Sequence, residues 1–446
     1  MNWRFALVIL LVHALLPLDA IPVRSTVNIQ SNPSPSNGDT RDYYLGVTAT
    51  PRFVGNLTGE FTIGYAEDAY DEISSIGEYT VFDTGADWYD IPESLQDNGT
   101  LEIISWIDDY DLGVVLRTSF WNTSDIGGGL IRPTVSFPSD WPSNTAINDS
   151  QFVDAWIEHC ENITEQVSPE FLVLGQTVNE FWGYSDNPHS VNNTFNDFLD
   201  LCEQATDAVH EIDSGVETII EFDLQTVIDR NQWELIENIT SSHCDIVGFT
   251  SYPYRHGSPI GTVYASPSDL PAGYYAQIEN HTTVSLAFTS VGWSTGFMND
   301  SYSNFTGSES GQEDFVEHFF SSVDNLSDVV LVVWNSLHDT MPVGNETDLN
   351  QMMGLNYYNG TNKSALDEWK DTFQRSYGDD DDSGDEDPSN DIIGYDPIFS
   401  WWMGLLFFGV TVVATVGAIY GLERWMQRKD RERCGCTGRP GCDCSI

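Results

Sequence analysis

The chain has 446 residues and a formal net charge of −52, with 17 Lys and Arg against 69 Asp and Glu. A surface this acidic repels phosphate backbones, which argues against a nucleic-acid partner. Hydrophobic residues make up 40% of the chain and aromatic residues 13%, which is enough for a large core and excludes global disorder. The composition fits both a protein adapted to high salt and an acidic glycoprotein.

The first 20 residues, MNWRFALVILLVHALLPLDA, contain one basic residue, an apolar stretch and a small residue at Ala20. This pattern is typical of a secretory signal peptide and is too short for a membrane span. Residues 21–41 are rich in Ser, Pro and Asn without periodicity, which predicts a flexible leader.

The central part, residues 42–377, alternates between two kinds of hydrophobic pattern. Short apolar or β-branched runs predict eight strands, at residues 44–48, 79–82, 112–116, 171–174, 216–222, 245–249, 284–289 and 329–334. Apolar residues at helical spacing lie between them, as in Phe195, Phe198 and Cys202. The alternation predicts the α/β class and a (β/α)8 TIM barrel, because an open doubly wound sheet usually has a glycine-rich first turn, which YLGVTATPRF lacks.

The C-terminal part predicts attachment to a membrane. Residues 378–398 are acidic and form a predicted stalk, and residues 399–422 run about 24 positions without a charge. That length suffices to cross a hydrocarbon core. Five basic residues follow the span at once, Arg424, Arg428, Lys429, Arg431 and Arg433, so the positive-inside rule places the tail, 423–446, in the cytoplasm and the barrel outside. We therefore expect a single-pass type I protein of the cell surface or another secretory-pathway membrane.

The predicted external part also carries many N-x-S/T sequons, which fits this orientation. The predicted glycosylation sites are Asn56, Asn98, Asn122, Asn148, Asn162, Asn192, Asn238, Asn280, Asn299, Asn304, Asn325, Asn345, Asn359 and Asn362.

The cysteines divide between the two sides of the predicted span. Outside, Cys160 and Cys202 fall on neighbouring predicted helices and are the expected disulfide, with Cys202–Cys244 as the alternative. In the tail, the C-x-C pairs of CGCTGRPGCDC fit poorly to structural zinc spacings. Cysteines just inside a membrane are more often S-palmitoylated, which we expect at Cys434 and Cys436. The sequence predicts no cofactor and no metal site, although zinc in the tail is an alternative.

In a (β/α)8 barrel the functional groups lie at the C-terminal ends of the strands. Flat aromatic faces beside hydrogen-bonding groups are suited to holding sugar rings, and packing within loops is the alternative for any single one. The predicted residues for binding an extracellular glycan are Trp88, Trp121, Trp182, Tyr252, Trp293 and Trp334.

Three of these strand ends resemble, in order, those of the clan A retaining glycoside hydrolases, particularly the endo-galactanase-like members. DIVGFTSYPY on the sixth strand and SVGW on the seventh match the framework, as does LGQTVNEFW on the fourth. The resemblance covers roughly residues 42–375. It implies a barrel with a sugar cleft, in which a Glu after strand four is the acid/base and a Glu after strand seven is the nucleophile.

Both of those positions differ here. Aligned on Gly292–Trp293, the nucleophile position is Ser290, and aligned on Leu174–Gly175, the Asn-Glu pair becomes Gln176–Thr177. Retaining hydrolysis needs two carboxyl groups about 5–5.5 Å apart. Serine without an adjacent base is a poor nucleophile, and threonine cannot act as a general acid. The two replacements therefore predict a loss of hydrolysis.

Glu180, three residues farther along, is the fallback acid/base. The nucleophile would still be missing, and Glu221 or Asp339 could replace it only if the fold brought it within reach. The sequence thus favours a carbohydrate-binding or structural pseudo-enzyme, and the alternative is an active extracellular glycosidase with a rearranged carboxylate pair. A third hypothesis is a surface receptor or coat component.

Overall fold

The computed structural model describes residues 40–52, 63–84, 88–90, 95–96, 98–125, 131–142, 145–182, 194–254, 262–299, 304–340 and 352–378. The chain divides into two units, residues 1–379 and 380–446, and all described residues belong to the first. The predicted signal peptide, stalk, membrane span at 399–422 and tail cysteines lie outside the described residues. Among the helices that are described, none is both long and apolar enough to cross a membrane.

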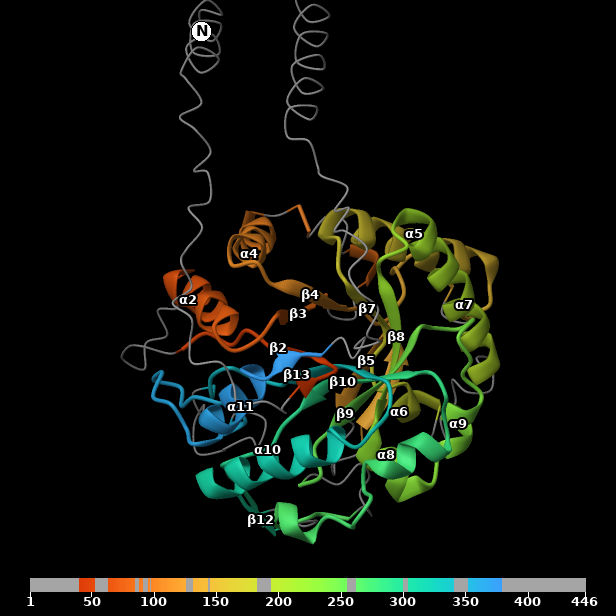
Figure 1. Ribbon diagram of the computed structural model, residues 1–446. Helices are drawn as coiled ribbons and strands as arrows, with labels where there is room; N and C mark the ends of the chain where they lie inside the picture. Colours follow the sequence, from red (N-terminus) through yellow and green to blue (C-terminus); the bar gives the residue numbers. More distant parts are fainter. Residues whose placement is uncertain are drawn as a thin grey trace, which may run out of the picture. The chain divides into compact units, whose positions relative to one another are not determined.

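Eight parallel strands form a closed barrel, in which neighbours in sequence are also neighbours in space (Figure 1). The strands are β2 (Tyr44–Val47), β3 (Tyr79–Asp83), β4 (Gly113–Arg117), β7 (Phe171–Gly175), β8 (Glu217–Asp223), β9 (Ile246–Ser251), β10 (Ser285–Val291) and β13 (Val329–Trp334). Each overlaps one predicted strand, so the predicted (β/α)8 fold is confirmed. The strands read as continuous apolar runs because the inside of the barrel and the helical layer bury both of their faces.

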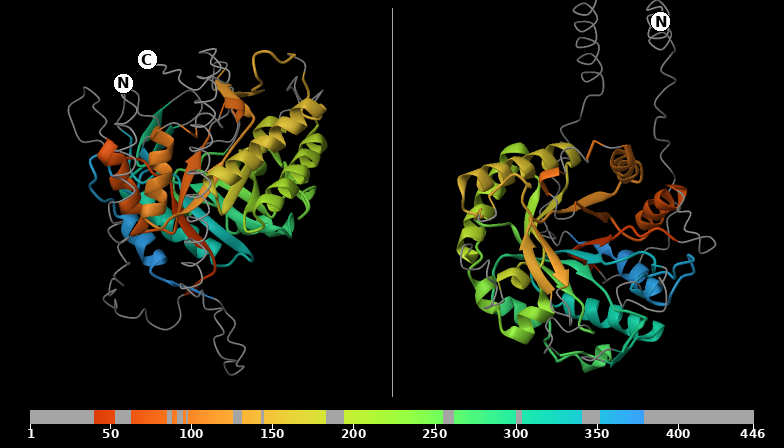
Figure 2. Two further views of the ribbon diagram at one scale, coloured as in Figure 1. Left: turned by 90° about the horizontal axis from the view of Figure 1, so that it is seen from above. Right: turned by 180° about the vertical axis from the view of Figure 1, so that it is seen from behind.

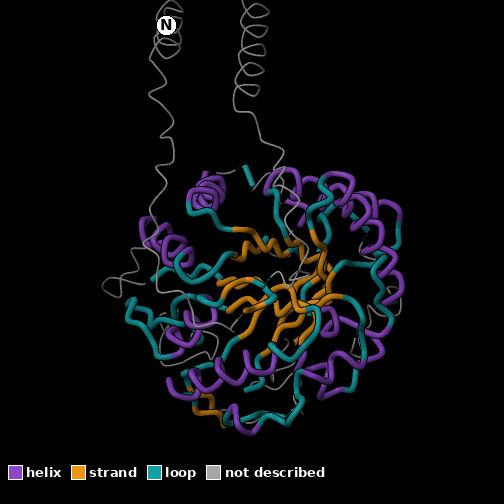
Figure 3. The backbone as a smooth tube through the Cα atoms, in the orientation of Figure 1, coloured by secondary structure: helices purple, strands orange, loops and turns teal. Residues whose placement is uncertain are grey.

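Helices surround the barrel, as the central strands and outer helices of Figure 3 show. They are α2 (Ile63–Ser74), α4 (Asn98–Asp109), α5 (Ser150–Val167), α6 (Val178–Trp182), α7 (Phe195–Ile212), α8 (Leu224–Arg230), α9 (Trp233–Glu237), α10 (Glu309–Val323) and α11 (Ala365–Phe373). Between β9 and β10 the described residues hold only two short 3-10 helices, η3 (Pro267–Asp269) and η4 (Ala276–Asn280). Two hairpins, β5 (Trp121–Asp125) with β6 (Ile131–Val135) and β11 (Phe297–Asn299) with β12 (Asn304–Thr306), extend from the barrel (Figure 2).

The two ends of the barrel unit pair with each other. The two-residue strand β1 (Thr40–Arg41) runs parallel to β14 (Ser376–Tyr377). The Tyr377 ring stacks on Tyr44 at 4.7 Å between centroids, and Arg41 forms an ion pair with Glu78. These contacts attach the last two residues of the predicted leader, and the residues just before the predicted stalk, to the N-terminal side of the barrel.

The three described cysteines correct the disulfide prediction. Cys160 on α5, Cys202 on α7 and Cys244 before β9 are buried free thiols, so neither the expected Cys160–Cys202 bond nor the Cys202–Cys244 alternative is formed. Burial raises the pKa of all three thiols, that of Cys244 to about 12. Because the thiolate is the species that reacts, burial opposes oxidation, and the three side chains act as small apolar groups.

The predicted glycosylation sites vary in how they are placed. Six are exposed, namely Asn148, Asn238, Asn280, Asn325, Asn359 and Asn362, and Asn162 is half-buried on α5. The side chains at positions 98, 122, 299 and 304, and all of residues 56, 192 and 345, lie outside what the structure describes. Glycosylation itself stays a prediction.

Candidate functional site at the barrel mouth

The inward-facing side chains change from apolar to polar at the C-terminal end of the barrel. Below that end, the barrel interior is filled by Val81, Val115, Phe171, Val173, Ile219, Ile246, Ala287, Leu331 and Val333. Side chains alternate between faces along a strand, so the next inward positions are Asp83 on β3, Arg117 on β4 and Glu221 on β8. These three residues form the polar floor of the candidate site.

The centre of this floor is an ion pair between Arg117 and Glu221. The guanidinium Nη2 donates to both Glu221 carboxylate oxygens, at 2.8 and 2.9 Å. The same carboxylate accepts from the Thr289 hydroxyl at 2.7 Å and from the Thr177 backbone N–H at 3.2 Å. Asp83 lies on the other side of the guanidinium, 3.8 Å from Nη1.

These contacts decide what Glu221 can do. Its side chain is fully buried and both of its oxygens are engaged. Burial works against the charge of Arg117, but Glu221 and Asp83 more than offset this and raise the pKa of the guanidinium. Glu221 is therefore placed as the partner of a permanent cation and has no surface from which to attack a sugar.

Ser290, at the position aligned with the nucleophile, belongs to a neutral cluster. Its hydroxyl lies 2.6 Å from the Tyr252 hydroxyl, and the Asn335 amide nitrogen donates to Ser290 at 2.9 Å and to Tyr252 at 2.7 Å. Ser290 is 2% exposed. In this described part of the mouth, hydroxyl and amide groups lie at the end of β10, at the position for which the resemblance implied a carboxylate.

The end of β7 has an unusual backbone. Thr177 adopts a left-handed conformation with φ of 46°, which is rare for a β-branched residue. This conformation turns its N–H toward Glu221 while its carbonyl accepts from the backbone N–H of Glu180. Gln176 reaches across the mouth, with its amide nitrogen 3.4 Å from both oxygens of Asp83.

The Asn179–Glu180 pair lies on the short helix α6 that follows β7. Asn179 is fully buried and bridges two loops, since its amide donates to the Asp223 carbonyl and to Gln232 and accepts from the Asp223 N–H. Glu180 is half-buried on the same helix. The fallback acid/base is thus the neighbour of a structural asparagine, displaced from the strand end.

Asp339, the other fallback nucleophile, forms an ion pair away from solvent. It lies 2.7 Å from the Lys363 ammonium, and both side chains are fully buried. Burial raises the pKa of Asp339 despite that partner, and burial also lowers the pKa of Lys363. The backbone N–H of Gly354 donates to the same carboxylate oxygen, so Asp339 holds residues 354–363 against the end of β13.

The predicted sugar-binding aromatics lie mostly inside the protein. Trp88, Trp121, Tyr252, Trp293 and Trp334 are 2%, 4%, 8%, 1% and 0% exposed. They contact other rings, as in the 5.4 Å approach of Trp88 to Trp156 and the 5.2 Å stack of Trp293 on Phe315. Trp182 alone among the six is half-buried, and it packs on Trp121 at 5.5 Å. In the described residues, one predicted indole face is therefore partly available to a ligand.

Two residues that bond to the groups at the mouth were not predicted from the sequence, Thr289 and Asn335. Both follow from strand alternation, because Thr289 comes two positions after the inward Ala287 and Asn335 two after the inward Val333. Extending the period of two by one step past each apolar run would have found them.

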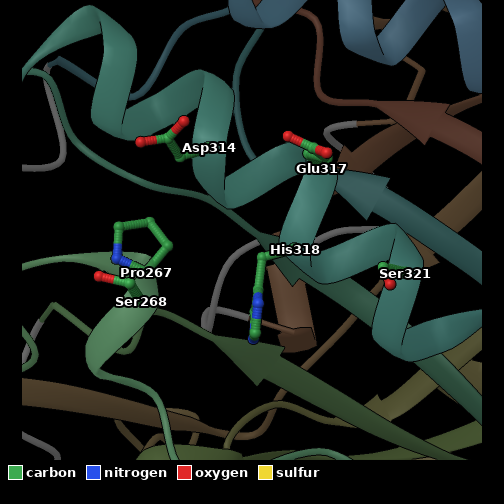
Figure 4. A pocket seen from close by; sticks show the side chains of 6 residues that line it. All are labelled: Pro267, Ser268, Asp314, Glu317, His318 and Ser321. Atoms are coloured by element: carbon green, nitrogen blue, oxygen red, sulfur yellow. The ribbon is translucent and has the colours of Figure 1, made fainter.

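A hollow lies on the outer helical layer, between α10 and η3 (Figure 4). It has a volume of about 290 Å³ and is lined by Pro267, Ser268, Asp314, Glu317, His318 and Ser321. His318 points into the gap from α10, and no Phe, Tyr or Trp is among the described residues that line it. Within the described ranges, no three His, Cys, Asp or Glu side chains converge as a metal ion requires.

No protein-family model and no curated protein sequence matches the chain. Solved structures do share its fold. The exo-β-1,4-mannosidase Op5Man5 from Opitutaceae bacterium strain TAV5 is 13% identical with a TM-score of 0.55, over 75% of this chain and 60% of that one. A GH5_18 variant from Bifidobacterium longum subsp. longum, in complex with Manβ1-4GlcNAc, is 14% identical with a TM-score of 0.52, over 74% and 78%. A GH5_18 variant from Streptomyces cattleya, in complex with the same disaccharide, is 14% identical with a TM-score of 0.52, over 74% of this chain and 80% of that one.

The described unit is therefore a (β/α)8 barrel of the glycoside-hydrolase-like kind. The chain spans less than two thirds of the length of the mannosidase. At identities of 13 and 14% the likeness establishes the fold alone, and function has to be argued from the site.

Proposed function

We propose that this protein is a membrane-anchored, N-glycosylated cell-surface barrel that binds carbohydrate without hydrolysing it. The observation that carries the proposal is the side-chain chemistry at the two strand ends. Ser290 closes a neutral cluster after β10, and Thr177 directs its backbone N–H to Glu221 after β7. Neither position supplies the carboxyl group that retaining hydrolysis needs.

The fallback carboxylates support the same reading. Glu221 and Asp339 are both fully buried in ion pairs, with Arg117 and Lys363 respectively. A carboxylate held by two hydrogen bonds to a guanidinium is a weak nucleophile, because attack would leave the buried cation without its partner. Asp83 is the exposed acidic group of the floor, but it faces the same guanidinium.

Membrane attachment and surface location rest on the sequence of the C-terminal part. The uncharged segment 399–422 followed by basic residues favours a type I span, and the exposed sequon asparagines are accessible to glycosylation. Palmitoylation at Cys434 and Cys436 would add a second anchor at the cytoplasmic face. Protease protection of the tail, surface biotinylation and a mass shift on removal of N-glycans test these three parts.

The binding proposal is tested with the full-length chain in detergent and a panel of β-linked oligosaccharides that includes Manβ1-4GlcNAc. We expect saturable binding of at least one glycan and no released sugar after prolonged incubation. Hydrolysis that disappears in Glu180→Gln would instead establish the alternative, an active glycosidase with rearranged carboxylates. Binding of no glycan would contradict the proposal and favour a purely structural or receptor role.

A further inference from the structure

The cluster of Ser290, Tyr252 and Asn335 can be analysed by counting its hydrogens. Three short contacts join the three side chains: Asn335 Nδ2 to the Tyr252 hydroxyl at 2.7 Å, Asn335 Nδ2 to the Ser290 hydroxyl at 2.9 Å, and hydroxyl to hydroxyl at 2.6 Å. Each contact needs one hydrogen between its two heavy atoms.

The count fixes the orientation of the Asn335 amide. If the amide oxygen faced the cluster, the two hydroxyls would supply two hydrogens for three contacts, and one oxygen pair would repel. With the nitrogen facing inward, the amide supplies two hydrogens and a hydroxyl supplies the third. The orientation with Nδ2 toward the two hydroxyls, which the side chain adopts, is therefore the one that satisfies the cluster.

The consequence is that the Asn335 amide oxygen is turned away from the cluster. Both N–H groups are used inside, and the residue is half-buried where Ser290 is 2% and Tyr252 8% exposed. Asn335 directly follows β13, the last strand of the barrel, at an inward position beside the mouth. The cluster thus presents a hydrogen-bond acceptor, held in place by two bonds, to whatever enters.

We propose that Asn335 is a specificity-determining residue, whose amide oxygen accepts a hydrogen bond from an uncharged sugar hydroxyl and disfavours sugars that carry a carboxylate. This inference rests on the proposed carbohydrate-binding function and specifies its ligand class. A sugar hydroxyl can donate to the amide oxygen, whereas a carboxylate only accepts. Two acceptors in contact leave both without a hydrogen and cost the desolvation of each.

The experiment compares glycans that differ in one group. β-1,4-Mannotetraose and β-1,4-tetramannuronate share linkage and ring configuration, as do cellotetraose and β-1,4-tetraglucuronate, and each pair differs in hydroxymethyl against carboxylate. Affinities are measured by calorimetry on the full-length chain in 0.5 M NaCl. At that ionic strength the net charge of −52 acts over only a few ångströms, so short-range recognition dominates.

We expect the wild-type protein to bind the neutral member of a pair at least tenfold more tightly. Asn335→Leu should weaken neutral binding about tenfold, the effect of losing one ordered acceptor, and should strengthen uronate binding, because the acceptor that opposes the carboxylate is gone. Ser290→Ala removes one of the two hydrogen bonds that hold the Asn335 amide, and it should weaken neutral binding less, by about threefold. This variant also tests the proposal if Asn335→Leu does not fold. Gln277→Leu, an amide on η4 outside the mouth, should change neither affinity.

Equal or tighter uronate binding by the wild type overturns the inference, as does an unchanged neutral-to-uronate ratio in Asn335→Leu. These outcomes still leave carbohydrate binding in place. If neither neutral tetrasaccharide nor any other glycan of the panel binds the wild type, the proposed function itself fails.

Discussion

Arg117 and Glu221 are joined by two hydrogen bonds of 2.8 and 2.9 Å, although they are 104 positions apart in the chain. The carboxylate is fully buried and the guanidinium is 16% exposed. The pair links β4 to β8, past the β7 strand between them, and Thr177 after β7 and Thr289 on β10 donate to the same carboxylate. One ion pair therefore organises the ends of four strands.

Replacing Arg117 by Met should destabilise the protein by about 3–5 kcal/mol, because the buried Glu221 carboxylate loses its counter-charge. The double replacement, Arg117→Met with Glu221→Leu, should recover most of this loss, since no buried charge remains. The free energy of unfolding in urea is measured for these two variants, for Glu221→Leu alone and for the wild type, which together form a double-mutant cycle. A single Arg117→Met variant as stable as the wild type would contradict the role of the pair.

The fold was predictable because strand and helix patterns are local. Runs such as FLVLG at β7 and VVLVVW at β13 are apolar throughout, and the runs between them have helical spacing. Eight such alternations leave few topologies, since strand–helix–strand connections are right-handed and place consecutive strands side by side. The irregular β9–β10 connection, with 3-10 helices in its described part, has no such pattern and was not predicted.

The bonding within the site was not predictable, because it joins residues far apart in sequence. Asn335 reaches Tyr252 across 83 positions, and no spacing rule links them. The aromatic residues illustrate the same limit: position at a strand end does not tell whether an indole faces solvent or, like Trp334, is fully buried with its N–H bonded to the Met353 carbonyl. The sequence thus identified which polar and aromatic residues lie at the strand ends, but which of them are exposed depends on tertiary packing.

The left-handed backbone at Thr177 leads to a stability prediction. A β-branched residue at φ of 46° is strained by roughly 1–2 kcal/mol, and glycine relieves this strain. Thr177→Gly should therefore raise the free energy of unfolding by up to about 1 kcal/mol, after the entropy cost of glycine is subtracted. Thr177→Ala keeps the Cβ atom and should gain less than Gly. Thermal unfolding compares them, and a loss of stability in the Gly variant would show that the conformation carries no strain.

His159 should make the barrel sensitive to mild acid. It is 3% exposed among Trp88 and Trp156, and burial lowers its pKa to about 3 from the ordinary 6.5. As the pH falls through 6.5, the His159 imidazole therefore binds a proton in the unfolded chain but stays neutral in the folded chain. The contribution of His159 to the free energy of unfolding is therefore unaffected by pH above 6.5. Between pH 6.5 and the folded-state pKa of about 3, it lowers the free energy of unfolding by about 1.4 kcal/mol for each unit of pH.

The measurement is the free energy of unfolding from pH 8 to pH 4.5 for the wild type and for His159→Phe. At pH 8 both side chains are uncharged, so the difference there reports packing and the lost hydrogen bond to the Thr118 hydroxyl, which is 2.9 Å long. Below pH 6.5 the wild type should lose stability more steeply than the variant. Parallel curves for the two proteins would mean that His159 is not the buried neutral group described here.

Replacing Trp182 should mainly affect ligand binding, whereas replacing Trp334 should mainly affect stability. Trp182 is half-buried beside the mouth, whereas Trp334 is fully buried with its indole N–H bonded to the Met353 carbonyl at 2.8 Å. Trp334→Ala should destabilise the fold by about 3–5 kcal/mol, because it opens a large cavity and leaves that carbonyl with one fewer donor. Trp182→Ala should cost less stability, because the side chain is only half-buried, and under the proposed function it should lower the affinity for a bound glycan. Affinity and urea unfolding measured on both variants distinguish the roles, and a Trp182→Ala variant with full affinity would place the sugar elsewhere on the mouth.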